Sequence, residues 1–536
     1  MKKSLFTLLA SILLIISFTG CSDKDVFSFV NKTVVVDKPG DLANALALTN
    51  LSGINTLKIS GKMDSRDFKT IRDHMSELKE LDLSNVTIVA YKGYEGTGGI
   101  EIYDYQANYI PNYAFYNPKT GSSITSLNKI TFPQNLKVIG SSAFVGCTGL
   151  TSLNFPTELK NIGDRCFARC SGLTNKVIIP AKVDTIGYSA FAFCSALTSI
   201  QLSDSLLYIG ETAFIGCSSL SGTITLPSKL TSINDATFQS CSSLTQINIP
   251  ASLQSIGVSA FQDCNCTLNV APENQNFMTS NGVLYDYSQT TIKYCTPNKT
   301  GTFEIPGSVM LIDYAAFSNC KNLTSIIIPP SITQIQISDY AFSNCSGLSG
   351  TFTIPNSVVS LGYFAFQGCT GITNFDVAVD NPALSSIDGV LFDAGKTTLK
   401  QFPPAKNGTF IIPETVGTID SGAFIDCAGL SSVNIPASVT SIGDRAFMNC
   451  TGLSSVNIPA SVTDIYDHAF TNCSGLTSIY EHSTTPIQFT VENRTTSWSV
   501  FFNVNKTNCT LFVPNGSKSA YQNANQWKDF RNITEM

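Results

Sequence analysis

The sequence predicts a solenoid, a strand-dominated, right-handed stack of coils of about 23 residues joined by a parallel β-sheet. Residues 431–453 read SSVNIPASVTSIGDRAFMNCTGL, and residues 454–476 read SSVNIPASVTDIYDHAFTNCSGL. The element A-F-x-x-C also recurs along the chain at nearly this period, for example around Phe424, Phe447 and Phe470. A fixed period of this length is typical of units that bury their apolar edges only by stacking on neighbours.

The pattern inside one coil predicts three inward edges. In residues 455–458 apolar and polar residues alternate, so Val456 is expected to point inward and Asn457 outward. Pro459 ends this strand because it has no N–H for the sheet ladder. Val462 and Phe470 mark the second and third inward edges.

Two enlarged coils interrupt the repeat. The interval between successive phenylalanines of A-F-x-x-C more than doubles from Phe261 to Phe317, and it does so again from Phe366 to Phe424. Each enlarged coil therefore contains additional chain that the regular period does not explain.

The two enlarged coils share a motif. The first contains NGVLYD at 281–286 and the second contains DGVLFD at 388–393. An apolar strand, a polar turn and a second apolar strand are expected in each, so we predict hairpin inserts near 265–302 and 374–409. The residues that follow each motif also match at a constant separation, which indicates that a block of the chain was duplicated with its insert.

The N-terminus has the features of an export signal. Lys2 and Lys3 precede an apolar run that is too short to span a bilayer, so residues 1–20 are predicted to be a signal peptide. The segment before Cys21 resembles a bacterial lipobox, which would make Cys21 the lipidated first residue of the mature chain. Residues 22–25 resemble the acidic tag of lipoproteins on the outer face of the outer membrane, although an ordinary polar tether explains them as well. Membrane contact is expected only through this lipid.

The remaining chain divides into a tether at 21–34, an N-terminal cap at 35–110, the repeats at 111–480 and a C-terminal cap at 481–536. In the first cap we expect a strand at 57–59, a helix at 65–78 and a leucine-rich strand at 78–85. The Gly- and Tyr-rich residues 91–109 are expected to form a surface loop. In the second cap we expect a final strand at 511–513 and a helix over 519–530.

The repeat unit L-x-x-V-x-I-P-x-x-V-x-x-I-G-x-x-A-F-x-x-C resembles the BspA-type leucine-rich repeat of bacterial surface lipoproteins. The matching residues in one coil are Leu430, Val433, Ile435, Pro436, Val439, Ile442, Gly443, Ala446, Phe447 and Cys450. This resemblance implies a leucine-rich-repeat solenoid of the α/β type in which strands dominate, and it implies a surface location. Some members are linked to adhesion to host matrix proteins and to other cells. It implies no catalytic residues and no cofactor.

Twelve of the 17 cysteines occupy the repeated A-F-x-x-C position and are predicted to be buried free thiols. Their Cβ vectors run parallel in successive coils, which disfavours bonding. Cys266 and Cys295 lie in the first insert, and the second insert has no cysteine at the equivalent positions. These two are our candidates for a disulfide.

Other chemistry is poorly supported. The chain has three histidines, so we expect no metal site, and the cluster Asp464, Asp467 and His468 is interpreted as a polar turn. No P-loop, G-x-S-x-G or H-E-x-x-H motif occurs, and paired carboxylates do not recur on a strand, so we predict that the protein is not an enzyme. Charged residues make up 13% of the chain without a basic patch, which argues against nucleic acid as a partner.

The outward positions of the repeated strands are the candidate binding face. They are Asn154, Gln201, Thr225, Asn248, Asn434 and Asn457, joined by Ile178, Ile327 and Ile411. A solubilising amide ladder is an equally good interpretation of this row. We therefore predict an adhesion protein that binds extracellular proteins, with a glycan-binding lipoprotein for nutrient capture as the alternative, based on the amide row and the tyrosines at 91–109. A hydrolase is the weakest of the three interpretations.

Overall fold

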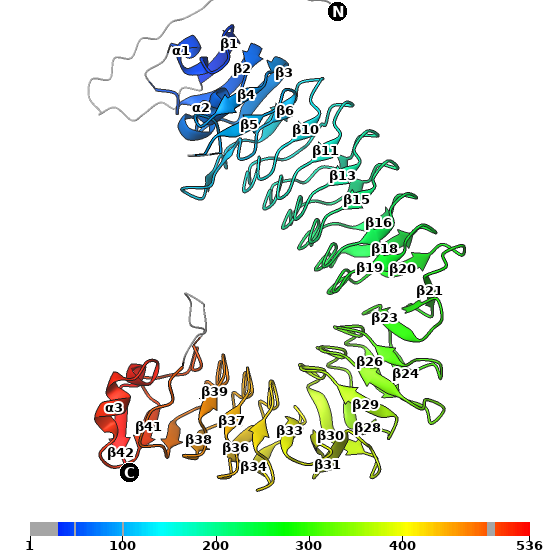
Figure 1. The fold of residues 1–536 in the computed structure, drawn as a ribbon, viewed down its shortest axis with the longest axis vertical. Coiled ribbons are helices and arrows are strands. Elements are labelled where there is room, and N and C mark those ends of the chain that lie inside the picture. The colour runs from blue at the N-terminus through cyan, green and yellow to red at the C-terminus, as the bar shows by residue number, and fades with distance from the viewer. Residues whose placement is uncertain (1–29, 48–49, 99–100, 490–498) are drawn as a thin grey trace, which may run out of the picture.

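The computed structural model describes residues 30–47, 50–98, 101–489 and 499–536. Within these ranges the chain forms a solenoid that curves into an open arc, with a cap at each end (Figure 1). The predicted signal peptide and Cys21 lie outside the described residues. None of the helices in the described ranges is both long and apolar enough to cross a bilayer.

Most regular coils contribute a strand to one row of parallel sheets and a shorter strand to a second row. The strands of the first row are β9 (Lys129–Thr131), β12 (Val177–Ile178), β14 (Ile200–Gln201), β16 (Gly222–Thr225), β18 (Leu244–Ile249), β20 (Thr267–Val270), β24 (Gly301–Glu304), β26 (Leu323–Ile327), β28 (Ser349–Ile354), β30 (Gly371–Val377), β34 (Gly408–Ile411), β36 (Leu430–Asn434), β38 (Ser455–Ile458) and β40 (Ser478–Glu481). The strands of the second row are β6 (Tyr109–Ile110), β10 (Val138–Ile139), β11 (Asn161–Ile162), β13 (Thr185–Ile186), β15 (Tyr208–Ile209), β17 (Ser232–Ile233), β19 (Ser255–Ile256), β25 (Leu311–Ile312), β27 (Ile335–Ile337), β29 (Val358–Leu361), β35 (Thr418–Ile419), β37 (Ser441–Ile442) and β39 (Asp464–Ile465).

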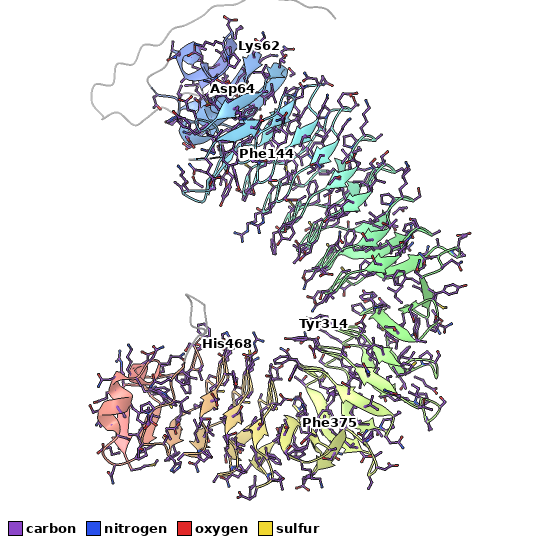
Figure 2. The ribbon with its side chains drawn as sticks, viewed as in Figure 1. Lys62, Asp64, Phe144, Tyr314, Phe375 and His468 are labelled. Atoms are coloured by element: carbon purple, nitrogen blue, oxygen red, sulfur yellow. The ribbon has the colours of Figure 1, made fainter. Side chains whose placement is uncertain are left out.

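The predicted inward edges are confirmed in the coil used to derive them. Val456, Val462 and Phe470 are at most 2% exposed, whereas Asn457 is exposed. The phenylalanines of neighbouring coils stack, and the rings of Phe447 and Phe470 lie 5.1 Å apart at an angle of 1°. Such stacks form the centre of the core on either side of the inserts, and the labelled Phe144 belongs to the first of them (Figure 2).

The turn around A-F-x-x-C lies on the inner side of the arc, as the labelled Tyr314 and His468 show in Figure 2. Two residues of each turn adopt the left-handed conformation, for example Arg445 (φ 52°) directly before Ala446 and Asn449 (φ 63°) directly before Cys450. Gly, Asn, Asp and Ser are frequent at the second of these positions because they tolerate positive φ best. The periodicity alone did not predict this turn.

Both inserts contain the predicted hairpin and one further strand. The first consists of β21 (Phe277–Ser280), β22 (Val283–Asp286) and β23 (Thr291–Cys295), and the second of β31 (Leu384–Ile387), β32 (Val390–Asp393) and β33 (Thr398–Gln401). These strands are antiparallel to one another, and β23 and β33 then pair in parallel with β25 and β35 of the second row.

The inserts explain where the arc bends. An enlarged coil has no inner turn, so Asn319 on the far side of the first insert donates a hydrogen bond directly to Asp263 on the near side. At the second insert the Gly368 amide donates to Asp426 at 3.0 Å in the same way. Strands β21 and β31 lie on the outer margin at the same places (Figure 1). Each insert therefore adds chain on the outer margin of the arc and lacks a turn on its inner side, so that it acts as a wedge. The buried core divides into three clusters that meet at the two inserts.

The N-terminal cap contains β1 (Val30–Val36), α1 (Leu42–Leu46), β2 (Ile54–Met63), α2 (Ser65–His74) and β3 (Glu80–Ile88), and β1, β2, β3 and β9 form one parallel sheet. The expected strands and helix are present, but α2 ends before the predicted residue 78. Residues 91–109 are not a plain loop, because β4 (Tyr91–Gly93) and β5 (Tyr103–Tyr105) form an antiparallel hairpin. A smaller hairpin, β7 (Tyr116–Asn117) and β8 (Ser122–Ser123), follows.

The C-terminal cap differs from the prediction in two ways. The single short helix expected over 519–530 is two pieces, α3 (Lys518–Asn523) and the 3₁₀ turn η1 (Trp527–Asp529), because the backbone is extended at Ala524 and left-handed at Gln526. The strand β41 (Thr510–Val513) is not the last, since β42 (Asn532–Glu535) adds to its edge in parallel. The three side chains predicted to share one face of that helix, Tyr521, Ala524 and Trp527, are all buried.

Candidate functional site: the inner turns and the first insert

An aromatic strip lies on the inner turns between and just beyond the two inserts. We define it as Tyr340, Tyr363, Phe364 and Arg445. The rings of Tyr340 and Phe364 stack at 5.1 Å and 18°, and the Arg445 guanidinium lies 5.8 Å from the centre of the Phe364 ring. Tyr363 is 52% exposed. The strip therefore offers stacked aromatic faces and a delocalised cation to a ligand.

A glycine permits the contact between Phe364 and Arg445. The coil between them has Gly422 at the same place in the turn, with φ 68°. A Cβ there would lie 2.6 Å from the Phe364 ring, so any larger residue would push the ring aside. The strip thus depends on one small residue as well as on its aromatic members.

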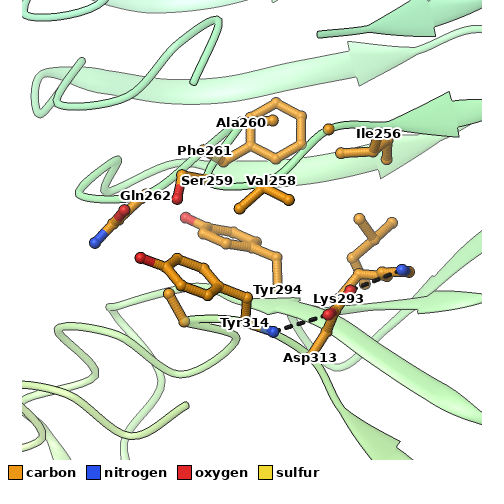
Figure 3. A pocket seen from close by; sticks show the side chains of 13 residues that line it. Ile256, Val258, Ser259, Ala260, Phe261, Gln262, Lys293, Tyr294, Asp313 and Tyr314 are labelled. Atoms are coloured by element: carbon orange, nitrogen blue, oxygen red, sulfur yellow. Dashed lines mark hydrogen bonds and ion pairs between the residues drawn. The ribbon is translucent and has the colours of Figure 1, made fainter. Parts of the chain in front are cut away.

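A pocket lies at the first insert (Figure 3), and the Tyr314 ring in its wall lies 5.5 Å from the Tyr340 ring of the strip. It has a cavity of about 140 Å³ between the coil that contains Val258 and the coil that contains Tyr314. Its walls include Ser259, Gln262, Leu284, Lys293, Tyr294, Asp313 and Tyr314. Polar groups and aromatic rings face the same small space.

Charge in the pocket is balanced. Lys293 and Asp313 form an ion pair of 2.7 Å, with each side chain about one-third exposed. Burial raises the pKa of Tyr314, and a hydrogen bond with Ser259 partly opposes that shift. The Tyr314 hydroxyl therefore stays protonated at neutral pH and is able to donate a hydrogen bond.

The second insert contains the equivalent pocket, but side chains of the protein fill most of its space. Lys400 and Asp420 repeat the ion pair at 2.7 Å. Tyr363 and Phe364 replace the smaller Val258 and Ser259, and the remaining cavity is about 10 Å³. The Lys400 ammonium lies 5.9 Å from the Tyr363 ring centre. The walls differ as well, because Gln401 and Ser421 stand where the first insert has Tyr294 and Tyr314. One site is thus open, whereas its duplicate gains two aromatic rings, loses two others and is almost filled.

A ladder of amides and carboxylates runs along the flank of the inner turns. Asp426 accepts a hydrogen bond from Asn449 at 2.6 Å, and Asn472 donates to Asn449 at 2.8 Å. Shallow polar grooves of about 550 and 590 Å³ border this ladder near Asn319 and Asn344. Sequence periodicity did not identify the side chains of this ladder. The signal that would have identified them is the frequent Asn, Asp or Gly directly before the cysteine of A-F-x-x-C.

The predicted outward row has the expected geometry for most of its members. The pairs Ile178–Gln201, Thr225–Asn248 and Asn434–Asn457 are in register on neighbouring strands. Asn154, Gln201, Thr225, Asn434 and Asn457 are exposed and Asn248 is half-buried, while Asn154 lies outside any strand. Ile178, Ile327 and Ile411 are 45–69% exposed.

Several amides of this row are engaged with one another. Asn248 donates to the Thr225 hydroxyl at 3.1 Å and accepts from Gln246 at 2.6 Å. Asn457 pairs with the His482 ring, and Gln201 accepts from Lys176 at 2.9 Å. This pattern agrees with a solubilising ladder, and whether the row binds a ligand stays a prediction.

The structure corrects the expected disulfide. Cys266 and Cys295 are both free and buried. Tyr294 and Cys295 are consecutive in β23 and therefore point to opposite sides. Tyr294 faces the preceding coil and donates to the Cys264 carbonyl at 2.8 Å, whereas the Cys295 side chain belongs to the next core cluster. The two sulfur atoms thus occupy different compartments of the core.

The other cysteines in the described ranges are also free and buried. Most of the repeated thiols donate a weak hydrogen bond to the phenylalanine carbonyl of the preceding coil, as Cys450 does to Phe424 at 3.0 Å. In the described part of the chain, no group of three His, Cys, Asp or Glu residues is arranged to hold a metal ion. His468 instead contacts the Thr471 hydroxyl at 2.9 Å.

The tyrosines at 91–109 pack largely on their own cap. Tyr91 and Tyr105 stack at 6.1 Å, and the Arg66 guanidinium lies 4.5 Å from the Tyr91 ring. Tyr105 is buried, whereas Tyr94 is 64% exposed. Tyr91 and Tyr103 are half-buried, so the hairpin uses part of its aromatic surface for internal packing and leaves the rest accessible.

Comparisons with known structures return bacterial repeat proteins. A leucine-rich repeat protein from Eubacterium ventriosum shares 26% identity over 61% of this chain and 80% of its own, with a TM-score of 0.43. One from Bacteroides ovatus shares 24% over 76% and 79%, with a TM-score of 0.36. A leucine-rich cell surface protein from Faecalibacterium prausnitzii shares 24% over 78% and 82%, with a TM-score of 0.39. Among curated protein sequences, none matches.

The family comparison is decisive for the repeat. The model of the BspA type leucine rich repeat region matches in six copies, over residues 108–222, 172–291, 288–406 and 398–525. Together these segments cover well over half of the chain. The protein therefore belongs to the BspA-type leucine-rich repeat family.

Proposed function

We propose that the protein is a non-catalytic interaction protein of the cell surface that adheres to host matrix proteins or to other cells through its aromatic strip. The observation that carries this proposal is the half-buried stack of Tyr340, Phe364 and Arg445 on the inner turns, with the exposed Tyr363 beside it. Solenoids commonly bind partners on their concave surface, and tyrosine and arginine dominate the energetics of protein interfaces.

The charges beside the strip indicate the chemistry of the partner. Asp339, Asp444 and Asp467 lie on the inner turns next to it, and burial raises the pKa of Asp444 while Arg445 opposes that shift. A partner would contact the carboxylates through lysine or arginine and the aromatic rings through an apolar side chain. The strip therefore suits a protein surface with basic residues.

Anchoring is a separate part of the proposal. The lipobox-like segment supports lipidation of Cys21 and display on the exterior of the outer membrane. Replacement of Cys21 by alanine is expected to release the protein from the membrane fraction and to abolish incorporation of a labelled fatty acid. Unchanged membrane retention and labelling would contradict this anchor.

Adhesion is tested by binding of the purified protein to immobilised matrix proteins. Tyr340→Ala, Phe364→Ala and Arg445→Ala are each expected to weaken binding by roughly tenfold or more, as truncation of interface anchors does. Tyr208→Ala removes an exposed tyrosine away from the strip and is the matched control. If Asn434→Ala abolishes binding and the strip variants do not, the outward row is the adhesion surface instead.

A glycan-binding role remains the second candidate. The features from which it was first predicted, the amide row and the tyrosines at 91–109, are partly engaged in contacts within the protein. The open pocket of the first insert is the observation that now favours it.

A further inference from the structure

We propose that the pocket of the first insert binds a single sugar residue of an uncharged glycan. This goes beyond the proposed adhesion to proteins and rests on different side chains. The site is built from Ser259, Gln262, Lys293, Asp313 and Tyr314 (Figure 3).

The size of the cavity limits the ligand to one ring. An internal cavity of about 150 Å³ is known to accept a molecule the size of benzene, and this pocket has about 140 Å³. The six ring atoms of a pyranose are of this size class, and its substituents would have to reach out through the rim, whereas an extended peptide would not fit. A longer glycan would have to continue into solvent along the inner turns.

The aromatic walls supply the apolar half of the recognition. The Tyr314 ring lines the cavity from one coil, and Val258 lines it from the coil before (Figure 3). Tyr294 forms the inner wall, and its hydroxyl is held by the Cys264 carbonyl. The C–H face of a sugar ring packs on such a wall, while its hydroxyl groups point to the rim.

The rim supplies both donors and acceptors. Gln262 accepts a hydrogen bond from Gln239 through Oε1 at 3.1 Å, so its amide nitrogen remains a donor for a ligand. The Ser259 and Tyr314 hydroxyls and the Asp313 carboxylate add groups that pair with sugar hydroxyls.

The ion pair argues for an uncharged ligand. Lys293 and Asp313 neutralise each other at 2.7 Å. A carboxylated or phosphorylated sugar would have to compete with Asp313 for the ammonium group. A neutral hexose or N-acetylhexosamine meets no such opposition.

The duplicate insert shows how this site is closed. At the left-handed position where the first insert has Ser259 (φ 56°), the second has Phe364 (φ 57°). The same backbone therefore accepts phenylalanine, and the cavity falls from about 140 to about 10 Å³. Ser259→Phe copies this natural closure without demanding a new backbone conformation.

The experiment is saturation-transfer NMR of the purified protein with a panel of neutral monosaccharides, followed by titration of the best one. We expect signal transfer from at least one neutral sugar and none from sialic or glucuronic acid. Ser259→Phe and Tyr314→Ala are expected to reduce the affinity at least tenfold. Thr212→Phe places the same ring at the equivalent left-handed position two coils earlier and should leave the affinity unchanged.

The outcomes separate this site from adhesion. Binding to matrix proteins should survive Ser259→Phe, because Ser259 is not part of the aromatic strip. No transfer from any neutral sugar, or transfer that Ser259→Phe leaves intact, would overturn the sugar site and leave the adhesion proposal standing. Preference for an acidic sugar would overturn the argument from the neutral ion pair.

Discussion

At the scale of single residues, the cysteine of each coil has a role that goes beyond filling space. Its thiol is buried, and in most coils it donates to the phenylalanine carbonyl of the coil before, at 2.8–3.2 Å in examples such as Cys217 and Cys264. Cys320 and Cys427 follow the inserts, where the preceding strand ends in Cys295 and Phe402 and not in an A-F-x-x-C turn, and their contacts to these two carbonyls lengthen to 3.7 and 3.8 Å. A small apolar side chain with a weak donor fits this position.

The buried thiols should be chemically silent in the folded protein. Burial raises the pKa of Cys147, Cys194 and Cys473 to about 12, so almost no thiolate is present at neutral pH. An Ellman assay of the mature protein lacking Cys21 is expected to detect no reactive thiol until denaturant is added, and then 16. Fast reaction of one thiol in the native state would show that its coil opens.

The stacked phenylalanines should dominate stability. Phe447 is fully buried between the rings of Phe424 and Phe470, at 4.7 and 5.1 Å. Phe447→Ala is expected to destabilise the protein by about 3–5 kcal/mol, because a cavity remains where the ring was. Limited proteolysis near residues 440–470 reports the effect, and Tyr208→Ala is the surface control. An unchanged cleavage pattern would contradict the stacking.

At the scale of elements, the junction between the last coil and the C-terminal cap contains a buried acid. Glu481 is in register with Ile458 of the previous coil, so a carboxyl group occupies a core position. Its side chain is fully buried, one oxygen accepts from the Ser483 amide at 3.1 Å, and the other has no hydrogen-bond partner among the described residues. Desolvation raises the pKa of Glu481 to about 8.

This acid should make the cap sensitive to pH. Because the folded pKa is raised above the ordinary value of 4.5, the protonated form is favoured in the fold. Its contribution to stability is fully present below pH 4.5 and is lost as pH rises to about 8. Thermal melts across this pH range are expected to show the loss in the wild type, and Glu481→Gln should flatten it. Equal slopes in both proteins would refute the assignment.

The cap itself is held by specific polar contacts of its aromatic residues. The Trp527 indole donates to the Ile487 carbonyl at 3.0 Å, and the Tyr521 hydroxyl donates to the Ser483 carbonyl at 2.8 Å. Both rings are fully buried against the last coils. These contacts cover the end of the stack, which would otherwise expose an apolar coil edge.

At the scale of the whole molecule, the inserts divide a continuous ladder into three cores. The first cluster extends into residues of the first insert, the second lies between the inserts, and the third runs from Val390 to the C-terminal cap. The stability of a solenoid is a sum of contributions from its coils and from the interfaces between them. Because a coil next to an insert packs on the insert and not on a regular coil, that interface is expected to separate units that unfold independently.

Hydrogen exchange is expected to show these boundaries. Under native conditions the opening free energies should group into three blocks that change near residues 283 and 390, because neighbouring coils open together. Phe447→Ala should accelerate exchange mainly in the block from 390 to 533. If exchange in Phe447→Ala accelerated equally in all coils, the inserts would not separate the coils into independent units.

Repetition made most of the fold predictable. The repeat period identified the inward Val456, Phe470 and their counterparts, because a core built by stacking imposes the same apolar positions on every coil. The recurrence of NGVLYD as DGVLFD revealed the duplicated inserts in the same way. The C-terminal cap was harder. Its helix is broken at Gln526, where positive φ is imposed by packing, and no periodic pattern reports that.

The candidate sites could not be predicted in the same way. The sequence by itself determined the stack, its thiol ladder and the outward amide row, since each of these depends on side chains that repeat with the coil. Only the tertiary structure decided that Cys266 and Cys295 face different cores, that Phe364 meets Arg445 across Gly422, and that Ser259 leaves open a pocket which Phe364 closes in the duplicate. These contacts join coils across an insert, and the distance between such residues is set by how the wedge bends the solenoid.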